Sequence, residues 1–176
     1  DGRIRRFLEK PSWGEVFSDT INTGIYILEP RVLDAIPSGR EFDFSKDLFP
    51  LMLSRGEPLY GFTANGYWRD IGNLSEYQQA HYDVLDGIVS VHIGGQRSGN
   101  VWIGQDCHIG RDVEFRGRVI IGDGARIGDR AILDSCVIGR HCTIGPGSTI
   151  VRSVLWDNVR IGDIATIESS VIASDV

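Results

Sequence analysis

The chain has little of what marks a membrane protein or a nucleic-acid-binding protein. Among its 176 residues no run approaches the roughly 18 apolar residues that cross a bilayer, and the first residues lack the apolar core of a signal peptide. The 18 basic side chains are scattered among 24 acidic ones, and the net charge is −6. Such a surface does not hold a nucleic-acid backbone. We therefore expect no membrane span, no polynucleotide partner and a cytoplasmic location.

Cysteine and lysine are also scarce. The three cysteines, Cys107, Cys136 and Cys142, cannot all pair and show no metal-ligand spacing. We expect Cys107 and Cys142 to be small apolar fillers. Lys10 and Lys46 are the only lysines, so lysine is not the default cation of this chain. Glycine is abundant instead, and 14 of the 22 glycines lie after residue 86.

The segment after residue 86 repeats a six-residue unit that begins with an aliphatic residue, usually followed by glycine. Every third unit is one residue short, so that Ile121, Ile138, Leu155 and Ile172 are equivalent positions. A period of six fits short parallel strands separated by turns, three to a coil. Such coils resemble those of the left-handed β-helix family, an exception to the right-handed crossover rule. We predict a left-handed parallel β-helix for residues 87–176.

The repeat also predicts which residues fill the helix. The fourth residue after each aliphatic anchor is expected to point into a narrow corner, and all of these residues are small: Cys107, Val113, Val119, Ala125, Ala131, Cys142, Ser148, Val159 and Ala165. We expect the glycine after each anchor to supply the backbone freedom of a turn. The sequence provides four coils and the start of a fifth, which ends on Val171-Ile172 without a polar cap. An open edge of this kind suggests either a covering partner subunit or a sequence cut short.

Residues 1–86 have a mixed α/β pattern. Asn73 and Glu76 form a capping box for a helix that runs through Leu85 and stops at Gly87. We expect this helix to be the junction between domains 1–86 and 87–176. The other expected elements are a short buried strand at 25–28, a helix at 30–36 that starts with proline, and a helix at 45–54 ended by Gly56.

Four phrases in this first segment carry chemistry. They are Phe7-Leu8-Glu9-Lys10-Pro11, Asn22-Thr23-Gly24-Ile25-Tyr26, Phe44-Ser45-Lys46-Asp47-Leu48-Phe49-Pro50 and Tyr67-Trp68-Arg69-Asp70-Ile71-Gly72. In this order, and followed by the repeat, they resemble the sugar-1-phosphate nucleotidylyltransferases, above all the mannose-1-phosphate guanylyltransferases. The resemblance implies that residues 1–86 are the C-terminal, sugar-binding part of a Rossmann-like nucleotidyltransferase domain.

The resemblance also implies a reaction and a site. A sugar-1-phosphate oxygen attacks the α-phosphorus of a nucleoside triphosphate, and pyrophosphate leaves. Mg²⁺ and fixed cations offset the charge of the two phosphates. Mannose 1-phosphate and GTP are the expected substrates. The implied roles are sugar binding by Glu9, Asn22, Thr23 and Gly24, contact with the sugar phosphate by a catalytic Lys10, and Mg²⁺ binding by Asp70.

The sequence departs from the family in one large respect. It contains no glycine-rich loop of the GxGTRLxPLT type to cradle the triphosphate, and it lacks the other metal aspartate. We therefore expect this polypeptide alone to be inactive.

Two other readings of the repeat remain open. Hexapeptide-repeat acyltransferases use a histidine between subunits, and His108 and His141 lie within the coils here. Each is adjacent to an inward position, so we expect both to face outward. Alternatively, the β-helix is a non-catalytic oligomerisation or regulatory module. This reading is compatible with the first one, and we expect a homo-oligomer.

Overall fold

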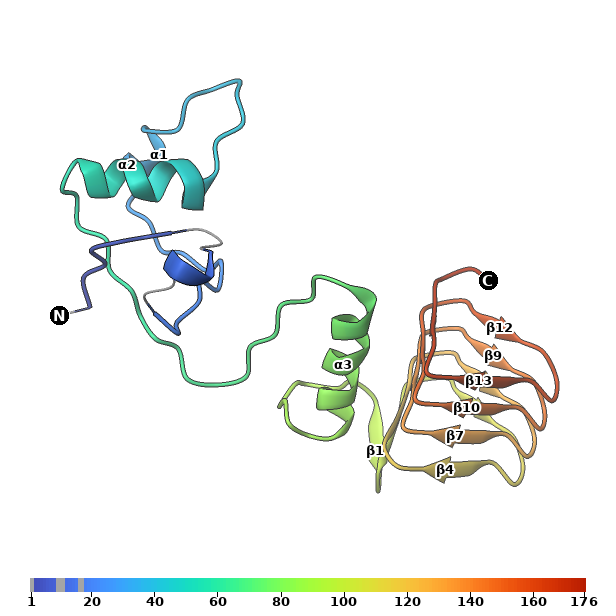
Figure 1. The fold of residues 1–176 in the computed structure, drawn as a ribbon. Coiled ribbons are helices and arrows are strands. Elements are labelled where there is room, and N and C mark those ends of the chain that lie inside the picture. Colours follow the sequence, from blue (N-terminus) through green and yellow to red (C-terminus); the bar gives the residue numbers. More distant parts are fainter. Residues whose placement is uncertain (1, 9–11, 16–17) are drawn as a thin grey trace. The chain divides into compact units, whose positions relative to one another are not determined.

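The computed structural model describes residues 2–8, 12–15 and 18–176 (Figure 1). By spatial contacts the chain forms two compact units, Asp1–Gly66 and Tyr67–Val176. Helix α3 (Leu74–Leu85) therefore packs with the repeats that follow it. The predicted domains, 1–86 and 87–176, were defined from sequence patterns, whereas the two units are defined by spatial contacts. The predicted division therefore stays a prediction.

The first unit is built around one short helical stretch. Its core consists of Leu48, Phe49 and Met52, which are almost fully buried. The Asp43 side chain accepts hydrogen bonds from the amides of Ser45 and Lys46, at 2.7 and 2.8 Å, and so caps the start of the stretch. The elements of the unit are η1 (Trp13–Glu15), α1 (Pro30–Leu33), the π-helical turn η2 (Phe44–Leu48) and α2 (Phe49–Ser54).

These elements test the helix predictions. The helix predicted at 45–54 is confirmed as the continuous pair η2 and α2, and Gly56 adopts a positive φ of 70° just after it. Helix α1 does begin with Pro30, but it ends at Leu33, earlier than predicted. The sequence did not indicate that the longer helix opens with a π turn.

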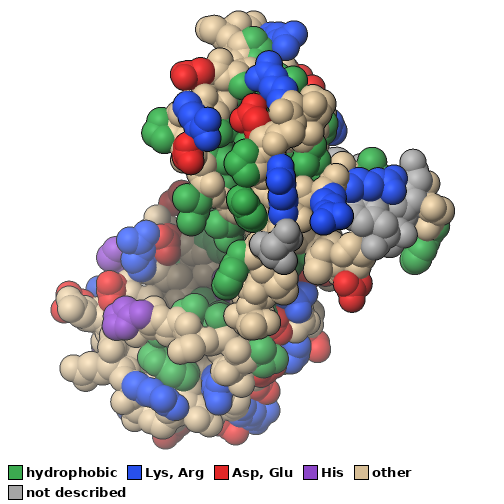
Figure 2. Space-filling view, turned by 90° about the vertical axis from the view of Figure 1, so that its left-hand side faces the viewer, with side chains coloured by type: hydrophobic (Ala, Val, Ile, Leu, Met, Phe, Trp, Pro, Cys, Tyr) green, Lys and Arg blue, Asp and Glu red, His purple; other side chains and the backbone are tan. Residues whose placement is uncertain are grey.

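The predicted buried strand at Ile25–Leu28 is wrong. These residues form no strand, and Ile25 and Ile27 are 78% and 101% exposed. A strand needs a neighbour to satisfy its backbone groups, and no strand of the described residues pairs with this segment. Other apolar side chains of the described residues are also exposed, as Figure 2 shows for one face.

The second unit is a parallel β-solenoid. Residues 101–168 fold into four complete coils, β1 precedes them and β14 follows them, and three sheets form the walls. Figure 1 shows β4, β7, β10 and β13 stacked in one wall. The strands are β1 (Gln96–Ser98), β2 (Val101–Ile103), β3 (His108–Ile109), β4 (Glu114–Arg116), β5 (Val119–Ile121), β6 (Arg126–Ile127), β7 (Ile132–Asp134), β8 (Val137–Ile138), β9 (Thr143–Ile144), β10 (Thr149–Val151), β11 (Val154–Leu155), β12 (Arg160–Ile161), β13 (Thr166–Glu168) and β14 (Val171–Ile172).

The register of the solenoid confirms the repeat. Ile121 pairs with Ile138, Ile138 with Leu155, and Leu155 with Ile172, as the shortened third unit predicted. Strand β1 is the exception, because it pairs antiparallel with β2. Most of the small residues predicted to point inward are fully buried: Val119, Ala125, Ala131, Cys142, Ser148 and Val159. The thiol of Cys142 donates a hydrogen bond to the Trp156 carbonyl, and burial raises its pKa, so it acts as a filler.

The glycine after each anchor has a different structural role from the predicted one. Gly104, Gly122 and Gly139, each of which follows an aliphatic anchor, do not have a positive φ. The positive φ falls two residues later, for example at Asp106 (55°) and His141 (56°). A Cβ on Gly139 would lie 2.5 Å from the Trp156 carbonyl carbon of the next coil. The glycine is thus required by the close approach of two coils rather than by the turn.

Helix α3 packs on the solenoid. Asn73 caps it by accepting the Glu76 amide hydrogen bond at 2.9 Å, but the Glu76 carboxylate turns to Arg69, so only half of the predicted capping box forms. The Trp156 indole donates to the Tyr77 hydroxyl at 2.8 Å, and the Tyr82 hydroxyl donates to the Arg152 carbonyl at 2.5 Å. No helix in the described part of the chain is long and apolar enough to cross a bilayer.

Candidate functional site

Asn22, Thr23 and Gly24 lie together in one exposed loop of the first unit. The side-chain Oδ1 of Asn22 accepts a hydrogen bond from the Gly24 amide at 3.0 Å, which makes an Asx turn. Its amide group donates to the Tyr26 hydroxyl at 2.6 Å and to the Ser45 hydroxyl at 3.3 Å. Gly24 has a φ of 75°, and a Cβ there would meet nothing within 4 Å, so the backbone is open on that side. The loop is therefore both shaped and accessible.

The aromatic core of the first unit holds this loop. The Tyr26 ring packs edge-on against Phe49 at 5.0 Å and also contacts Phe44 at 5.7 Å. These contacts place the Tyr26 hydroxyl where Asn22 reaches it. Sequence reasoning missed Tyr26 and Ser45 as partners of Asn22. The available signal was that both stand within the quoted phrases.

Asp70 lies in the second unit and is exposed. It has no hydrogen bond or ion pair to any residue that the structure describes. Its neighbours are held firmly, because the Tyr67 hydroxyl and the Arg69 guanidinium both donate to the buried Asp83 of α3, at 2.7 and 3.1 Å. Arg69 also pairs with Glu76. The sequence analysis did not identify this cluster, although Tyr67 and Arg69 stand in a quoted phrase.

The Asp83 carboxylate is stabilised in its charged form. The hydrogen bond from Gln79, followed by those from Tyr67 and Arg69, lowers the pKa of Asp83 despite its burial. Its partner Tyr67 shows the opposite effect: burial, then the bond to Asp83, raises the pKa of the phenol. The charged carboxylate is thus the state that the fold selects.

This direction gives a pH prediction. A carboxyl with a lowered folded pKa stabilises the fold above its unfolded pKa of about 4, and that contribution is lost as pH falls through the folded value. Urea unfolding at pH 7 should show Asp83→Asn less stable than the parent chain, and the difference should shrink at pH 3. An equal difference at both pH values would contradict the prediction.

The remaining predicted residues are placed only in part. Glu9 and Lys10 lie outside the described residues. The convergence of Glu9, Lys10, Asn22 and Asp70 on one phosphosugar pocket therefore stays a prediction. Within residues 2–8, 12–15 and 18–176, no group of three or more His, Cys, Asp or Glu side chains could hold a metal. Asp70 offers a single carboxylate, and Mg²⁺ commonly takes one or two carboxylates besides phosphate oxygens and waters.

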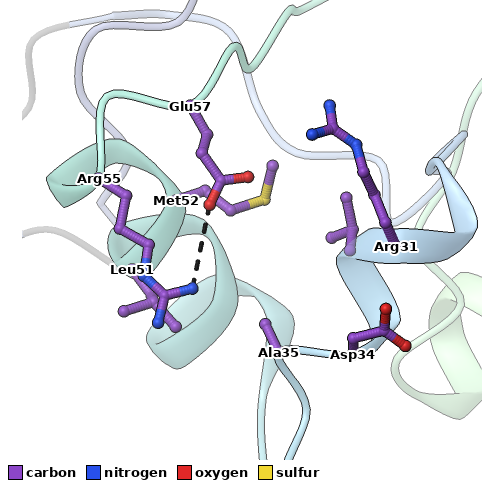
Figure 3. Close-up of a pocket in the computed structure, with 8 residues that line it drawn as sticks. Arg31, Asp34, Ala35, Leu51, Met52, Arg55 and Glu57 are labelled. Carbon is purple, nitrogen blue, oxygen red and sulfur yellow. Dashed lines mark ion pairs between the residues drawn. The ribbon is translucent and has the colours of Figure 1, made fainter.

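A hollow of about 370 Å³ lies elsewhere in the first unit, beside α1 and α2. Figure 3 shows Arg31 and Glu57 at its sides, and Arg55 pairs with Glu57 at 4.0 Å. None of the predicted site residues that the structure describes lines this hollow. It is separate from the Asn22 loop.

His108 and His141 are exposed on the solenoid, as predicted. His108 pairs through its backbone with Arg126 of the next coil, and His141 stands at a corner. Neither ring has a hydrogen bond or ion pair to any of the described side chains. The geometry therefore gives no support to an acyltransferase site.

Comparison with known families defines the class of the two segments. Residues 1–87 match the model of the Nucleotidyl transferase family, and residues 98–176 match the model described as EIF2B subunit epsilon LbH domain. The chain thus joins a nucleotidyltransferase segment to a β-solenoid of the left-handed β-helix type, which confirms the predicted fold class.

Individual relatives specify the class further. The chain is 40% identical to the UTP–glucose-1-phosphate uridylyltransferase of Synechocystis, over 89% of this chain and 42% of the relative. It is 33% identical to the mannose-1-phosphate guanylyltransferase of Mycobacterium tuberculosis, over 89% of this chain and 39% of the relative. The glucose-1-phosphate adenylyltransferase of Desulfitobacterium hafniense is 29% identical over 88% of this chain and 40% of the relative.

The chain is therefore a homologue of the sugar-1-phosphate nucleotidylyltransferases, as the four phrases indicated. It spans less than half the length of these curated relatives, 39% to 42%. Their printed names differ in both the base and the sugar.

Proposed function

We propose that this chain is part of an enzyme that transfers a nucleotidyl group from a nucleoside triphosphate to a sugar 1-phosphate and releases pyrophosphate. Mannose 1-phosphate and GTP are the proposed substrates, and the cytoplasm is the proposed location. The supporting observation is the match of residues 1–87 to the Nucleotidyl transferase family, together with relatives named for this reaction. The proposal assigns sugar recognition to this segment.

In this proposal each residue has a role that suits its charge or its hydrogen-bonding groups. Lys10 places a compact cation on the sugar phosphate, and Glu9 accepts hydrogen bonds from sugar hydroxyls. The Asn22 carbonyl oxygen has two lone pairs and uses one for Gly24, so the other can accept a hydroxyl. Thr23 and Gly24 complete the loop. Asp70 is the proposed Mg²⁺ ligand, and the metal would offset phosphate charge.

Sugar-phosphate binding tests the proposal. Titration calorimetry of the 176-residue chain should detect mannose 1-phosphate. Lys10→Ala removes a charged hydrogen bond worth about 1.5–3 kcal/mol, so affinity should fall at least about tenfold. Asn22→Ala should weaken binding about threefold to tenfold. Asn65→Ala, an exposed asparagine of the same unit, is the control and should bind as the parent does. Equal loss in all three variants, or binding of glucose 1-phosphate alone, would count against the assignment.

The chain by itself is proposed to bind without turning over. Its sequence contains no glycine-rich triphosphate loop, so the charge of the leaving pyrophosphate has no backbone cradle here. A pyrophosphate-release assay with mannose 1-phosphate, GTP and Mg²⁺ should show no turnover above the rate without protein. Any measurable turnover by this polypeptide would overturn this part of the proposal.

We also propose that the solenoid serves self-association. A parallel solenoid exposes sheet edges at its terminal coils, and paired or covered edges avoid open backbone groups. Light scattering of the chain, whose mass is 19.5 kDa, should give a multiple of that value. A mass that stays at one chain across micromolar concentrations would contradict self-association.

A further inference from the structure

The Asp83 carboxylate is buried, and it is the centre of a hydrogen-bonded cluster. It is 3% exposed, and aspartate is rarely buried to this degree unless it is paired. Both of its oxygens are engaged, one by Gln79 at 2.8 Å and the other by Tyr67 and Arg69. A buried charged cluster is often no more stable than an apolar one of the same size. The cluster therefore calls for an explanation other than stability.

What the cluster holds is the segment that carries Asp70. Tyr67 and Arg69 turn their polar ends toward α3 and bond to Asp83. Trp68 and Asp70 lie next to these two anchored residues in the chain, and both are exposed. Arg69 is fixed a second time by Glu76, one turn below Gln79 on the same helix.

We propose that Asp83 is a positioning residue for Asp70. By holding Tyr67 and Arg69 on α3, it fixes the backbone that presents the Asp70 carboxylate as a metal ligand. The inference rests on the proposed function, in which Asp70 binds Mg²⁺. Asp70 suits this role because its carboxylate is exposed and has no partner among the described residues. A hard oxygen ligand held in one orientation loses less freedom when the ion binds.

Paramagnetic NMR tests the inference on the whole 176-residue chain. Mn²⁺ alone is titrated into ¹⁵N-labelled protein, and broadening of the Ile71 and Gly72 amides reports metal at Asp70. The parent should show local broadening, and Asp70→Asn should abolish it. Asp83→Asn should require several-fold more Mn²⁺ for the same broadening, because it loosens both anchored residues that precede Asp70 in the chain. Tyr67→Phe should require about threefold more, since it removes one hydrogen bond and keeps the carboxylate.

A matched control separates positioning from stability. Tyr77→Phe removes one hydroxyl from the same helix but breaks only the bond from Trp156. It should leave the Mn²⁺ titration unchanged even where it lowers the melting temperature. Should Asp83→Asn fail to fold, Tyr67→Phe decides the question.

The outcomes distinguish the two proposals. If the parent shows no broadening at Ile71 and Gly72, the metal role of Asp70 fails, and the inference about Asp83 fails with it. If Asp70→Asn abolishes the broadening but Tyr67→Phe and folded Asp83→Asn titrate as the parent does, only the positioning role is overturned.

Discussion

Replacing Gly139 by alanine is expected to destabilise the chain by about 3 kcal/mol, near the upper end for overpacking. The added Cβ would lie 2.5 Å from the carbonyl carbon of Trp156 and 2.9 Å from the Asp157 amide nitrogen. Both atoms belong to the backbone of the next coil, which the Gly139 amide holds through a 2.8 Å bond to Leu155. Alanine also restricts the unfolded chain and so stabilises by roughly 0.4–1 kcal/mol, which is too little to compensate.

The chain contains its own control for this substitution. Gly162 occupies the same place in its hexapeptide, but a Cβ there would meet nothing within 4 Å, and its φ is not positive. Gly162→Ala should change the free energy of unfolding by no more than about 0.5 kcal/mol. Urea denaturation of the two variants beside the parent measures both values. If both glycines tolerate alanine equally, close coil contact is not why glycine stands there.

Leu133→Ala is expected to cost about 3 kcal/mol of unfolding free energy, as buried leucine truncations do. Leu133 is fully buried, and its strand β7 lies between β4 and β10, so coils on both sides surround the side chain. Neighbouring strands fixed by ladder hydrogen bonds cannot close the cavity fully. Thermal and urea unfolding should report a loss of stability with the β-solenoid otherwise retained.

Ile132 tests the same prediction from the other side of the strand. It precedes Leu133 in β7 and is only partly buried, since its side chain points out of the coil. Ile132→Ala removes a similar volume and should cost clearly less, about 1 kcal/mol. A larger loss at Ile132 than at Leu133 would mean that the assigned inward and outward faces are exchanged.

The solenoid could be predicted from sequence because its geometry repeats with the sequence. Each anchor meets its equivalent in the next coil, so one period determines both the inward residues and the register. The one-residue shortening fixed the pairing of Ile138 with Leu155, and the structure confirms it. The reason for the glycines could not be obtained in this way. A close approach between Gly139 and Trp156 is a contact between coils, and sequence alone gives no distance between coils.

The first unit was less predictable for a related reason. The pattern at Ile25–Leu28 is that of a strand, but strand formation depends on a neighbour that local pattern does not supply. The helix at residues 45–54 was predictable because its terminating glycine, Gly56, is a local signal. The cluster around Asp83 was not, because it joins a helix to an irregular segment through side chains 14 and 16 residues apart.

The candidate site shows the same division. The phrases predicted Asn22 and Asp70 as site residues, because the order of short motifs can be read from sequence, and that assignment stays a prediction. The partners that hold these residues, Tyr26 for Asn22 and Asp83 for the Asp70 segment, required coordinates. Motifs thus suggest candidate ligand-binding groups more readily than the groups packed behind them.

The pairing of parallel strands with their equivalents one coil away also bears on how the second unit acquires its structure. Strand partners such as Thr149 and Thr166 are separated by a single coil of chain, so every parallel sheet contact has a similar, modest loop-closure entropy. Folding of the solenoid can therefore nucleate in any pair of coils and propagate toward both ends. Terminal coils, stacked on one side only, should open first, and amide protons of the central coils should exchange most slowly with solvent.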